Sequence, residues 1–133
     1  MAGKIKQYLI DTDILIAHLR KPELVSSALL EIVENNLGFI SIISQAELFA
    51  GQSTTDPVIM TKIIKLINLF ITLPITEETA LLAGKIRRDY GLTLTDALIA
   101  ATGQNHDLYL MTFNLKDFAK IPQLKIGDIN NIN

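Results

Sequence analysis

In the stretch QYLIDTD, residues 7–13, a short apolar run ends directly on a carboxylate, Asp11. Residues 7–10 have the length and apolar character of a buried strand. Residues 13–19 predict a short helix, and the acidic and hydroxyl residues at its start can supply an N-terminal cap. A strand that passes directly into a helix is typical of α/β folds, whose functional sites lie where parallel strands end.

Three further acidic residues stand where an apolar segment ends or a helix begins. They are Glu47 after residues 39–43, Asp96 before residues 97–101, and Asp117 after residues 108–112. Because parallel strands end at a shared edge of their sheet, we expect these side chains to lie close to Asp11. In a chain with no Cys and two His, clustered carboxylates indicate a site for a hard divalent cation.

Apolar strands alternate with helical segments along the whole chain. Strands are predicted at residues 38–43, 71–73 and 108–112, with residues 123–126 as a candidate edge strand. Helices are predicted at residues 22–34, 57–69, 77–90 and 96–105, together with one that Ser44 caps and Gly51 ends. This alternation predicts an α/β fold with a mainly parallel central sheet and helices on both faces. With 133 residues and no linker or repeat, we expect a single domain over residues 1–133.

The composition narrows the classes of function. The net charge of −2 does not fit a passive nucleic-acid binder, so any nucleic acid would need a local basic patch or a bound metal. The absence of Cys excludes disulfides, thiolate zinc sites and Cys nucleophiles, and it fits a reducing cytoplasm. No apolar run approaches the ~18–20 residues of a membrane span. Because 49% of the residues are hydrophobic, we expect some apolar surface to meet a protein partner.

Each acidic residue also has a simpler interpretation. Asp11 can be an N-terminal cap, Asp96 a first-turn residue that favours the helix dipole, and Asp117 a solvated turn residue. Together they are harder to explain this way, because two like charges ~4 Å apart repel by about 4 kcal/mol at an effective dielectric of 20. Bound Mg²⁺ or Mn²⁺ would remove this repulsion and could activate water for hydrolysis of a phosphodiester.

Four segments resemble the motifs of PIN-domain nucleases, in the right order and over essentially the whole chain. They are LIDTDILI at residues 9–16, IISQAELFAG at 42–51, LTDALIAATG at 94–103 and LMTFNLKDF at 110–118. The similarity is closest to the small prokaryotic toxins of VapBC toxin–antitoxin pairs. It implies a PIN-like α/β/α sandwich and a cytoplasmic endoribonuclease that uses Mg²⁺ or Mn²⁺ and, as a toxin, inhibits translation.

The resemblance assigns roles to the acids. Asp11, Glu47 and Asp96 match the family's three most regular metal-binding acids. Asp11 and Asp96 would be direct ligands, and Glu47 would be either a ligand or the base that orients water. The fourth position falls on Asn114 or Asp117, and we expect Asp117 to serve the metal and catalysis through water while Asn114 positions it or the substrate.

Other residues have supporting roles in this comparison. Thr12 and Thr112 match small hydroxyl residues at the edge of the family's site, where they would position substrate, whereas Asp13 matches a position that we expect to be a helix cap. The candidates for RNA contact are basic: Lys85, Arg87, Arg88 and Lys116. The first three can equally be a solvated helix face with cations near its C-terminus.

The resemblance also implies partners. The family's toxins are homodimers, and a small antitoxin inhibits them by laying its tail in a groove near the active site. Here the apolar excess of residues 48–51 and 58–70 would form that groove, unless these side chains simply cover the sheet. We expect RNA as the substrate and no membrane association.

Three alternatives remain open. A PIN nuclease can process RNA without being a toxin. The Asp-x-Asp pair at Asp11 and Asp13 resembles the start of haloacid-dehalogenase-type phosphatases, but Leu15 stands where these enzymes have Thr or Val. Finally, Asn114 would suit an RNA-binding module with a degenerate site, although the other acids are intact.

Overall fold

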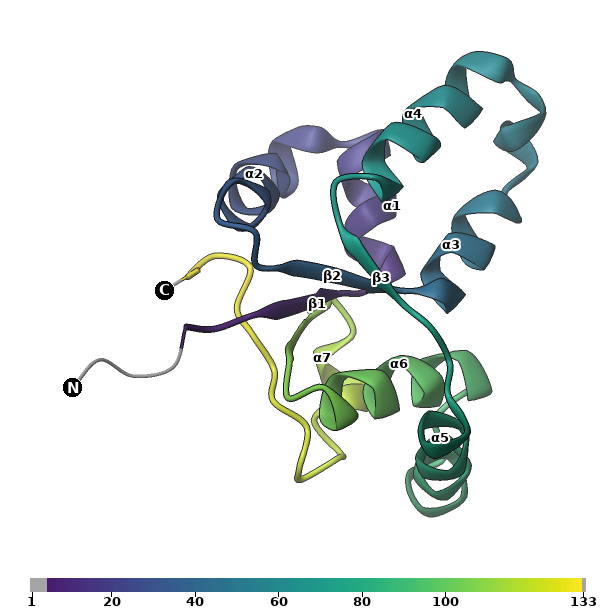
Figure 1. The fold of residues 1–133 in the computed structure, drawn as a ribbon, viewed down its shortest axis with the longest axis vertical. Helices are drawn as coiled ribbons and strands as arrows, with labels where there is room; N and C mark the ends of the chain where they lie inside the picture. The colour runs from purple at the N-terminus through teal and green to yellow at the C-terminus, as the bar shows by residue number, and fades with distance from the viewer. Residues whose placement is uncertain (1–4, 133) are drawn as a thin grey trace.

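A computed structural model describes residues 5–132 of the chain. Its centre is a parallel sheet in the order β3-β2-β1-β4. The strands are β1 (Tyr8–Ile10), β2 (Gly38–Ser41), β3 (Ile71–Leu73) and β4 (Tyr109–Met111). Helices lie on both sides of this sheet (Figure 1), which confirms the predicted α/β/α sandwich.

The helices divide into two layers. One face of the sheet carries α1 (Thr12–Arg20), α2 (Ser26–Glu34), α3 (Ile42–Phe49) and α4 (Pro57–Ile67). The other face carries α5 (Glu77–Tyr90), α6 (Leu94–Asn105) and the short α7 (Leu115–Phe118). Two 3₁₀ helices, η1 (Pro22–Leu24) and η2 (Gln52–Thr55), lie between α1 and α2 and between α3 and α4. None of the helices within residues 5–132 has the length and apolar character needed to cross a membrane.

The first strand contributes to both hydrophobic cores. Tyr8 and Ile10 pack in the core beneath α1, α2 and α4, whereas Leu9 packs in the core beneath α5 and α6. This follows from the alternation of side chains along a strand. Because a central parallel strand is covered on both faces, all its positions are apolar, and the whole of β1 is buried.

The register of the sheet places the ends of β1 and β4 side by side. Ile10 pairs with Met111, and the backbone N–H of Asp11 donates to the carbonyl oxygen of Met111 over 2.9 Å. Asp11 and Thr112 are the residues that follow these strands, so they emerge at the same edge of the sheet. This is the arrangement that the sequence predicted for the first and last motifs.

One predicted cap is wrong. Strand β2 ends at Ser41 and α3 begins at Ile42, earlier than the sequence suggested. Ser41 has an extended backbone, and its hydroxyl accepts the N–H of Ile43 over 3.1 Å, so Ser41 caps the helix. Ser44 therefore lies inside the first turn of α3, where it is fully buried.

Other boundaries follow local chemistry. Thr76 caps α5, Gly91 ends it with a φ of 72°, and Thr93 caps α6. The predicted helix at residues 22–34 is divided, because Val25 has a non-helical φ of −138° between η1 and α2. The candidate edge strand at residues 123–126 is reduced to one bridge between Leu110 and Ile126.

Candidate active site

Asp11 is held rigidly where β1 passes into α1. Its side chain is 5% exposed. Its Oδ1 accepts the backbone N–H of Thr12 over 2.8 Å, so Asp11 is the N-terminal cap of α1. Its Oδ2 accepts the hydroxyl of Thr112 over 2.7 Å. Both carboxylate oxygens are thus fixed by donors from two different segments.

Asp13 lies beside Asp11, and its hydrogen bonds differ from those of the predicted helix cap. It was expected to cap the helix, but Asp11 does so, and Asp13 instead bonds to the segment after β4. Its Oδ2 accepts the backbone N–H of Phe113 over 3.1 Å and lies 3.4 Å from the hydroxyl oxygen of Thr112. Its Oδ1 is buried, and no described residue donates a hydrogen bond to it.

Glu47 reaches the same edge from α3. Its Oε1 lies 2.7 Å from the hydroxyl oxygen of Thr12, and that hydroxyl also lies 2.9 Å from the Oγ of Ser44. Thr12 therefore stands between two acids, with its backbone N–H on Asp11 and its side chain on Glu47. Ser44 was missed as a site residue, although its place one helical turn before Glu47 puts both on one face of α3.

Asp96 enters the site from α6, on the other side of the sheet. It lies in the first turn of this helix, where its backbone N–H donates to the hydroxyl of Thr93. Burial raises the pKa of the Asp96 carboxyl, although the hydrogen bond from Thr93 lowers it, and the charge of Asp117 adds a further increase. The negative charge of Asp96 in turn raises the pKa values of Asp11 and Asp13.

Burial and like charge make Asp11 the most perturbed acid of the site. Burial, followed by the charge of Asp13, raises the pKa of Asp11 to about 7, although hydrogen bonds from Thr112 and Thr12 oppose the change. Burial also raises the pKa of Asp13. Perturbed carboxylates of this kind are typical of functional sites, where a bound charge compensates for them.

Asp117 and Asn114 form a pair at the margin of the site. The amide Nδ2 of Asn114 donates to Oδ2 of Asp117 over 3.1 Å, and the backbone N–H of Asn114 donates to the hydroxyl of Thr112. The ammonium group of Lys120 lies 3.6 Å from the other oxygen of Asp117. Asn114 thus orients Asp117, which is one of the two roles expected for it from the resemblance to PIN-domain nucleases. Lys120 partly balances the charge of Asp117.

The donor set of this site suits a hard cation. Within residues 5–132, no group of three acidic or histidine side chains is placed so that it could hold a metal ion. However, the carboxylates that meet here repel one another, and the buried Oδ1 of Asp13 has no donor. Oxygen ligands with unbalanced negative charge are what Mg²⁺ and Mn²⁺ prefer, so these residues fit such an ion.

The basic residues that are candidates for RNA contact differ in whether their side chains already bind another group of the protein. The guanidinium group of Arg87 donates to the carbonyl oxygen of Leu92 and so ties down the end of α5. Arg88 pairs with Asp89 over 2.8 Å. Lys85 and Lys116 are exposed.

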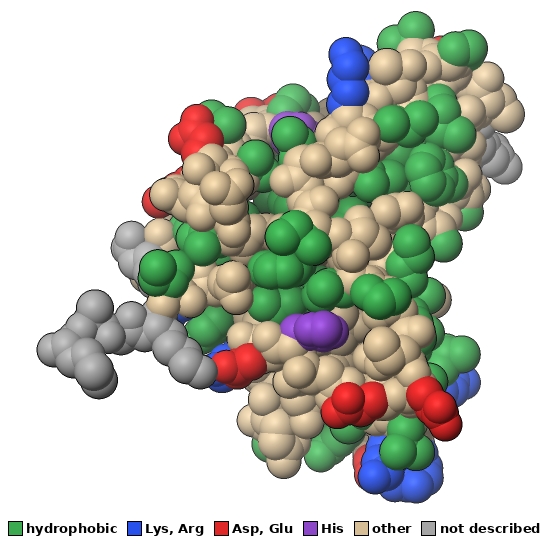
Figure 2. Space-filling model, in the orientation of Figure 1, with side chains coloured by type: hydrophobic (Ala, Val, Ile, Leu, Met, Phe, Trp, Pro, Cys, Tyr) green, Lys and Arg blue, Asp and Glu red, His purple; other side chains and the backbone are tan. Residues whose placement is uncertain are grey.

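An apolar groove adjoins Glu47 between α1, α3 and α4. Its cavity of about 180 Å³ is lined mainly by hydrophobic side chains and has charged groups beside them. The lining includes Ile16, Leu19, Leu48, Ile59 and Ile63, with Arg20 and Glu47. Figure 2 shows hydrophobic surface over this part of α3 and α4. The position agrees with the groove expected at residues 48–51 and 58–70.

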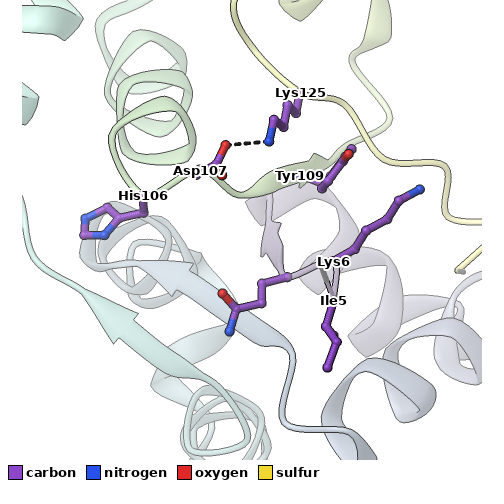
Figure 3. A pocket seen from close by; sticks show the side chains of 7 residues that line it. Ile5, Lys6, His106, Asp107, Tyr109 and Lys125 are labelled. Carbon is purple, nitrogen blue, oxygen red and sulfur yellow. Dashed lines mark ion pairs between the residues drawn. The ribbon is translucent and has the colours of Figure 1, made fainter. Parts of the chain in front are cut away.

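A larger hollow, of about 600 Å³, lies at the opposite end of the strands (Figure 3). Lys6 and His106 come before β1 and β4, whereas the acids come after them. The hollow is also lined by the carboxylate of Asp107, which forms an ion pair with Lys125 over 2.5 Å. Among the described residues that line this hollow, the carboxylate is thus paired with a lysine, in contrast to the carboxylates of the acidic edge.

Comparisons with known proteins agree with this geometry. The family model described as PIN domain matches residues 8–124. The chain is 36% identical over 122 residues to Ribonuclease VapC10 of Mycobacterium tuberculosis, which covers 88% of this chain and 90% of the relative. Ribonuclease VapC19 of the same species is 29% identical and covers 88% of this chain and 96% of the relative.

Solved structures show the same fold. A toxin–antitoxin complex from Klebsiella pneumoniae contains a chain with a TM-score of 0.75 and 28% identity, covering 92% of this chain and 98% of that one. VapBC2 from Rickettsia felis, bound to a DNA fragment from its promoter, gives a TM-score of 0.79 at 23% identity, covering 90% and 96%. The family model spans most of the chain, and its motifs coincide with the acidic edge of the sheet. The chain belongs to the PIN-domain family.

Proposed function

We propose that this protein is a metal-dependent endoribonuclease that hydrolyses RNA phosphodiester bonds. The observation that carries the proposal is the meeting of Asp11, Glu47 and Asp96 with Asp13 at one edge of the sheet, where Thr12 and Thr112 hold two of the carboxylates. Its similarity to a protein named Ribonuclease VapC10 supports RNA as the substrate.

Asp11 and Asp96 would hold Mg²⁺ or Mn²⁺ directly, with Glu47 as a further ligand or as the base that orients water. Bound there, the ion would activate water and stabilise the charge that develops on the phosphate. The protein's own part is positioning: Thr12 and Thr112 fix Asp11, and Asn114 orients Asp117. Thr12 and Thr112 would serve the reaction by holding these carboxylates in place, and the position of both residues at the edge of the site also allows the predicted contact with substrate.

RNA would approach the acidic edge with help from exposed cations. Lys85 and Lys116 are the better candidates for phosphate contact, because Arg87 is bound to the end of α5 and Arg88 to Asp89. Phosphate contacts of this kind position a nucleic acid without reading its sequence.

We further propose that the protein is the toxin of a toxin–antitoxin pair, that it inhibits translation, and that it acts in a prokaryotic cytoplasm as a homodimer. The relatives named as VapC ribonucleases and the similar chain in a toxin–antitoxin complex support this role. The groove between α1, α3 and α4 would receive an apolar tail of a small antitoxin. Glu47 at this groove would attract a basic residue of that tail.

The test is cleavage of structured RNA by the purified protein. We expect cleavage with Mg²⁺ or Mn²⁺, none with EDTA, and none from folded Asp11→Asn or Asp96→Asn variants. Cleavage that persists in both variants would refute the assignment. RNA binding without cleavage would instead indicate a degenerate module, and hydrolysis of a phosphomonoester alone would indicate a phosphatase.

The toxin role needs a cellular measurement. Induction of the wild-type protein should stop incorporation of labelled amino acids, and co-expression of the small protein encoded beside it should restore incorporation. Cleavage in vitro without any effect on translation would leave the alternative of an RNA-processing nuclease.

A further inference from the structure

Phe113 is the most exposed of the chain's five phenylalanines, and it lies at the acidic edge of the sheet. The residue is 49% exposed, whereas Phe118, in the same segment, is fully buried in the core. Phe113 comes directly after Thr112, whose hydroxyl donates to Oδ2 of Asp11 over 2.7 Å. An aromatic side chain therefore remains in contact with solvent one residue away from a bond to the carboxylate of Asp11.

Hydrogen bonds hold the backbone that carries this ring. The N–H of Phe113 donates to Oδ2 of Asp13 over 3.1 Å. On the next residue, the N–H of Asn114 donates to the hydroxyl of Thr112 over 2.9 Å. A phenylalanine has only two side-chain torsions, so it loses little conformational entropy when it binds a partner. The ring is thus presented from a fixed backbone, which suits a residue that binds a ligand.

We propose that Phe113 stacks on an unpaired base of the RNA substrate, beside the phosphate that is cut. The inference rests on the proposed function, in which that phosphate lies at the acids. Each base of RNA is joined to the backbone through one sugar, so a nucleotide held at the acidic edge brings a base close to position 113. Stacking on an aromatic side chain is a common way in which proteins hold unpaired bases.

This contact selects a class of RNA. In a double helix each base is covered on both faces by its neighbours, whereas a base in a loop or a single strand offers a face to a protein ring. Stacking accepts every base, because each has a π-face. Phe113 therefore favours unpaired over paired RNA without choosing the base. The phosphate contacts proposed for Lys85 and Lys116 do not make this distinction, because both forms of RNA carry phosphates.

A protein partner is the alternative occupant of this ring. The apolar groove proposed for the antitoxin lies between α1, α3 and α4, and Phe113 is not among the described residues that line it. The residues on either side of Phe113 are polar and bonded within the acidic site. A nucleotide can use both features of this place, with its phosphate at the cation and its base on the ring, which favours RNA.

The first experiment measures binding by fluorescence anisotropy with a labelled oligouridylate, both as a single strand and annealed to oligoadenylate. Ca²⁺ replaces Mg²⁺ to slow cleavage, and a denaturing gel checks that the RNA is intact. Phe113→Ala should weaken binding of the single strand about 5–150-fold, as expected for the loss of one stacked base, and should affect the duplex far less. Phe113→Trp should keep the wild-type affinity.

Two further variants separate stacking from general apolar contact. Phe113→Leu retains an apolar side chain but has no π-face, so it should lose nearly as much affinity for the single strand as Phe113→Ala. Leu115→Ala removes a neighbouring side chain from a residue that is 51% exposed, and it should change little. Wild-type binding by Phe113→Leu, or an equally large loss from Leu115→Ala, would overturn the proposal.

A fluorescent base reports the stacking directly. An oligouridylate with one 2-aminopurine should lose fluorescence when it binds the wild type or Phe113→Trp, because an aromatic ring stacked on this base quenches it. The loss should be smaller with Phe113→Ala and Phe113→Leu. The same quenching in all four proteins would contradict stacking on residue 113.

Kinetics and metal binding show whether Phe113 acts on the substrate or on the acids. Phe113→Ala should raise KM for RNA cleavage more than it lowers kcat, because the stacked base is held in the bound substrate as well as in the transition state. Mn²⁺ affinity, measured by calorimetry, should not change, because the N–H of residue 113 still donates to Asp13. A parallel loss of Mn²⁺ affinity would show a structural role instead.

The outcomes also separate this proposal from the proposed function. A wild type that neither binds nor cleaves RNA with Mg²⁺ refutes the function. If the wild type and Phe113→Ala cleave RNA equally well, only the stacking is refuted. If Phe113→Ala binds RNA normally but loses affinity for the antitoxin, the ring belongs to a protein interface and the proposal is wrong.

Discussion

Thr112 donates its hydroxyl to Oδ2 of Asp11 over 2.7 Å, across 101 positions of sequence. This bond joins the residues that follow β4 and β1, so it connects these two neighbouring strands at the end where the acids gather. It also supplies a donor to a buried carboxylate that burial and the charge of Asp13 destabilise. The site therefore combines a buried carboxylate whose ionised form is destabilised with a threonine hydroxyl that holds this carboxylate by a hydrogen bond.

Removing the charge of Asp11 should stabilise the metal-free protein at high pH. The pKa of Asp11 is raised to about 7 from an ordinary value of 3.8, so the folded state holds this proton more tightly than the unfolded state. The resulting stability is fully present below pH ~4 and is lost as the pH rises through 7. In EDTA at pH 8, Asp11→Asn should unfold at a higher temperature than the wild type, by an amount equivalent to roughly 2–4 kcal/mol.

The advantage of Asp11→Asn should shrink steadily as the pH is lowered from 8 to 4. Thermal unfolding followed by circular dichroism at several pH values measures it. A difference that does not change with pH would show that the ionisation of Asp11 is not what destabilises the site.

Divalent metal should offset most of the stability advantage that Asp11→Asn has over the wild type. At pH 8, Mg²⁺ at about 100 times its dissociation constant should stabilise the wild type by roughly 2.7 kcal/mol, because it binds the folded state alone. Asp11→Asn and Asp96→Asn should gain much less. Differential scanning calorimetry with and without Mg²⁺ measures these shifts, and an equal gain in all three proteins would place the ion elsewhere.

Loss of the Thr112 hydroxyl should be costly. In Thr112→Val, Oδ2 of Asp11 loses its donor while the carboxylate stays buried, which should lower the free energy of unfolding by about 1–3 kcal/mol at pH 8. Thr112→Ser keeps the donor and should lose far less. Urea unfolding provides the measurement, with Thr61→Val as the control, since Thr61 is exposed and its hydroxyl donates to the carbonyl oxygen of Pro57 in its own helix. Equal losses from Val and Ser at position 112 would argue against the bond.

The groove beside Glu47 can be blocked without touching the acids. Ser53 lines this groove and is exposed, so Ser53→Trp should fill the groove at little cost in stability. We expect it to weaken binding of the cognate antitoxin at least ~10-fold while RNA cleavage continues. Ser27→Trp, at an exposed position on α2, is the matched control and should bind normally. Calorimetric titration with the antitoxin measures this affinity, and tight binding of the antitoxin to Ser53→Trp would exclude this groove as its binding site.

The exposed lysines that we propose as RNA contacts should affect substrate binding and not metal binding. Lys116→Ala and Lys85→Ala should raise KM for RNA and reduce the dependence of binding on salt, because each would remove one proposed phosphate contact. Mn²⁺ affinity should not change. Lys62→Ala on α4 is the control and should match the wild type in cleavage assays at several salt concentrations. An unchanged KM in both lysine variants would direct the search for the RNA path elsewhere.

Local chemistry made much of this protein predictable from its sequence. Apolar runs of strand length, the caps at Thr76 and Thr93, and the glycine at position 91 each act within a few residues, so the alternation of strands and helices could be recognised. The four acids could be located for the same reason, since each stands at the boundary of an element. The order of the motifs then predicted the PIN-domain family, which the comparison confirms.

Only the tertiary structure decided which polar groups meet. Asp13 looked like a helix cap because its local position allows that role, yet it bonds to Phe113, and Ser44 looked like a cap but is buried against Thr12. These contacts span 100 and 32 positions, and they depend on strand order and register, which no local pattern encodes. The sequence alone therefore determined the elements and the acids, because short-range forces select them. Packing determined how the acids are held, because a hydrogen bond between distant segments exists only once the sheet has brought their ends together.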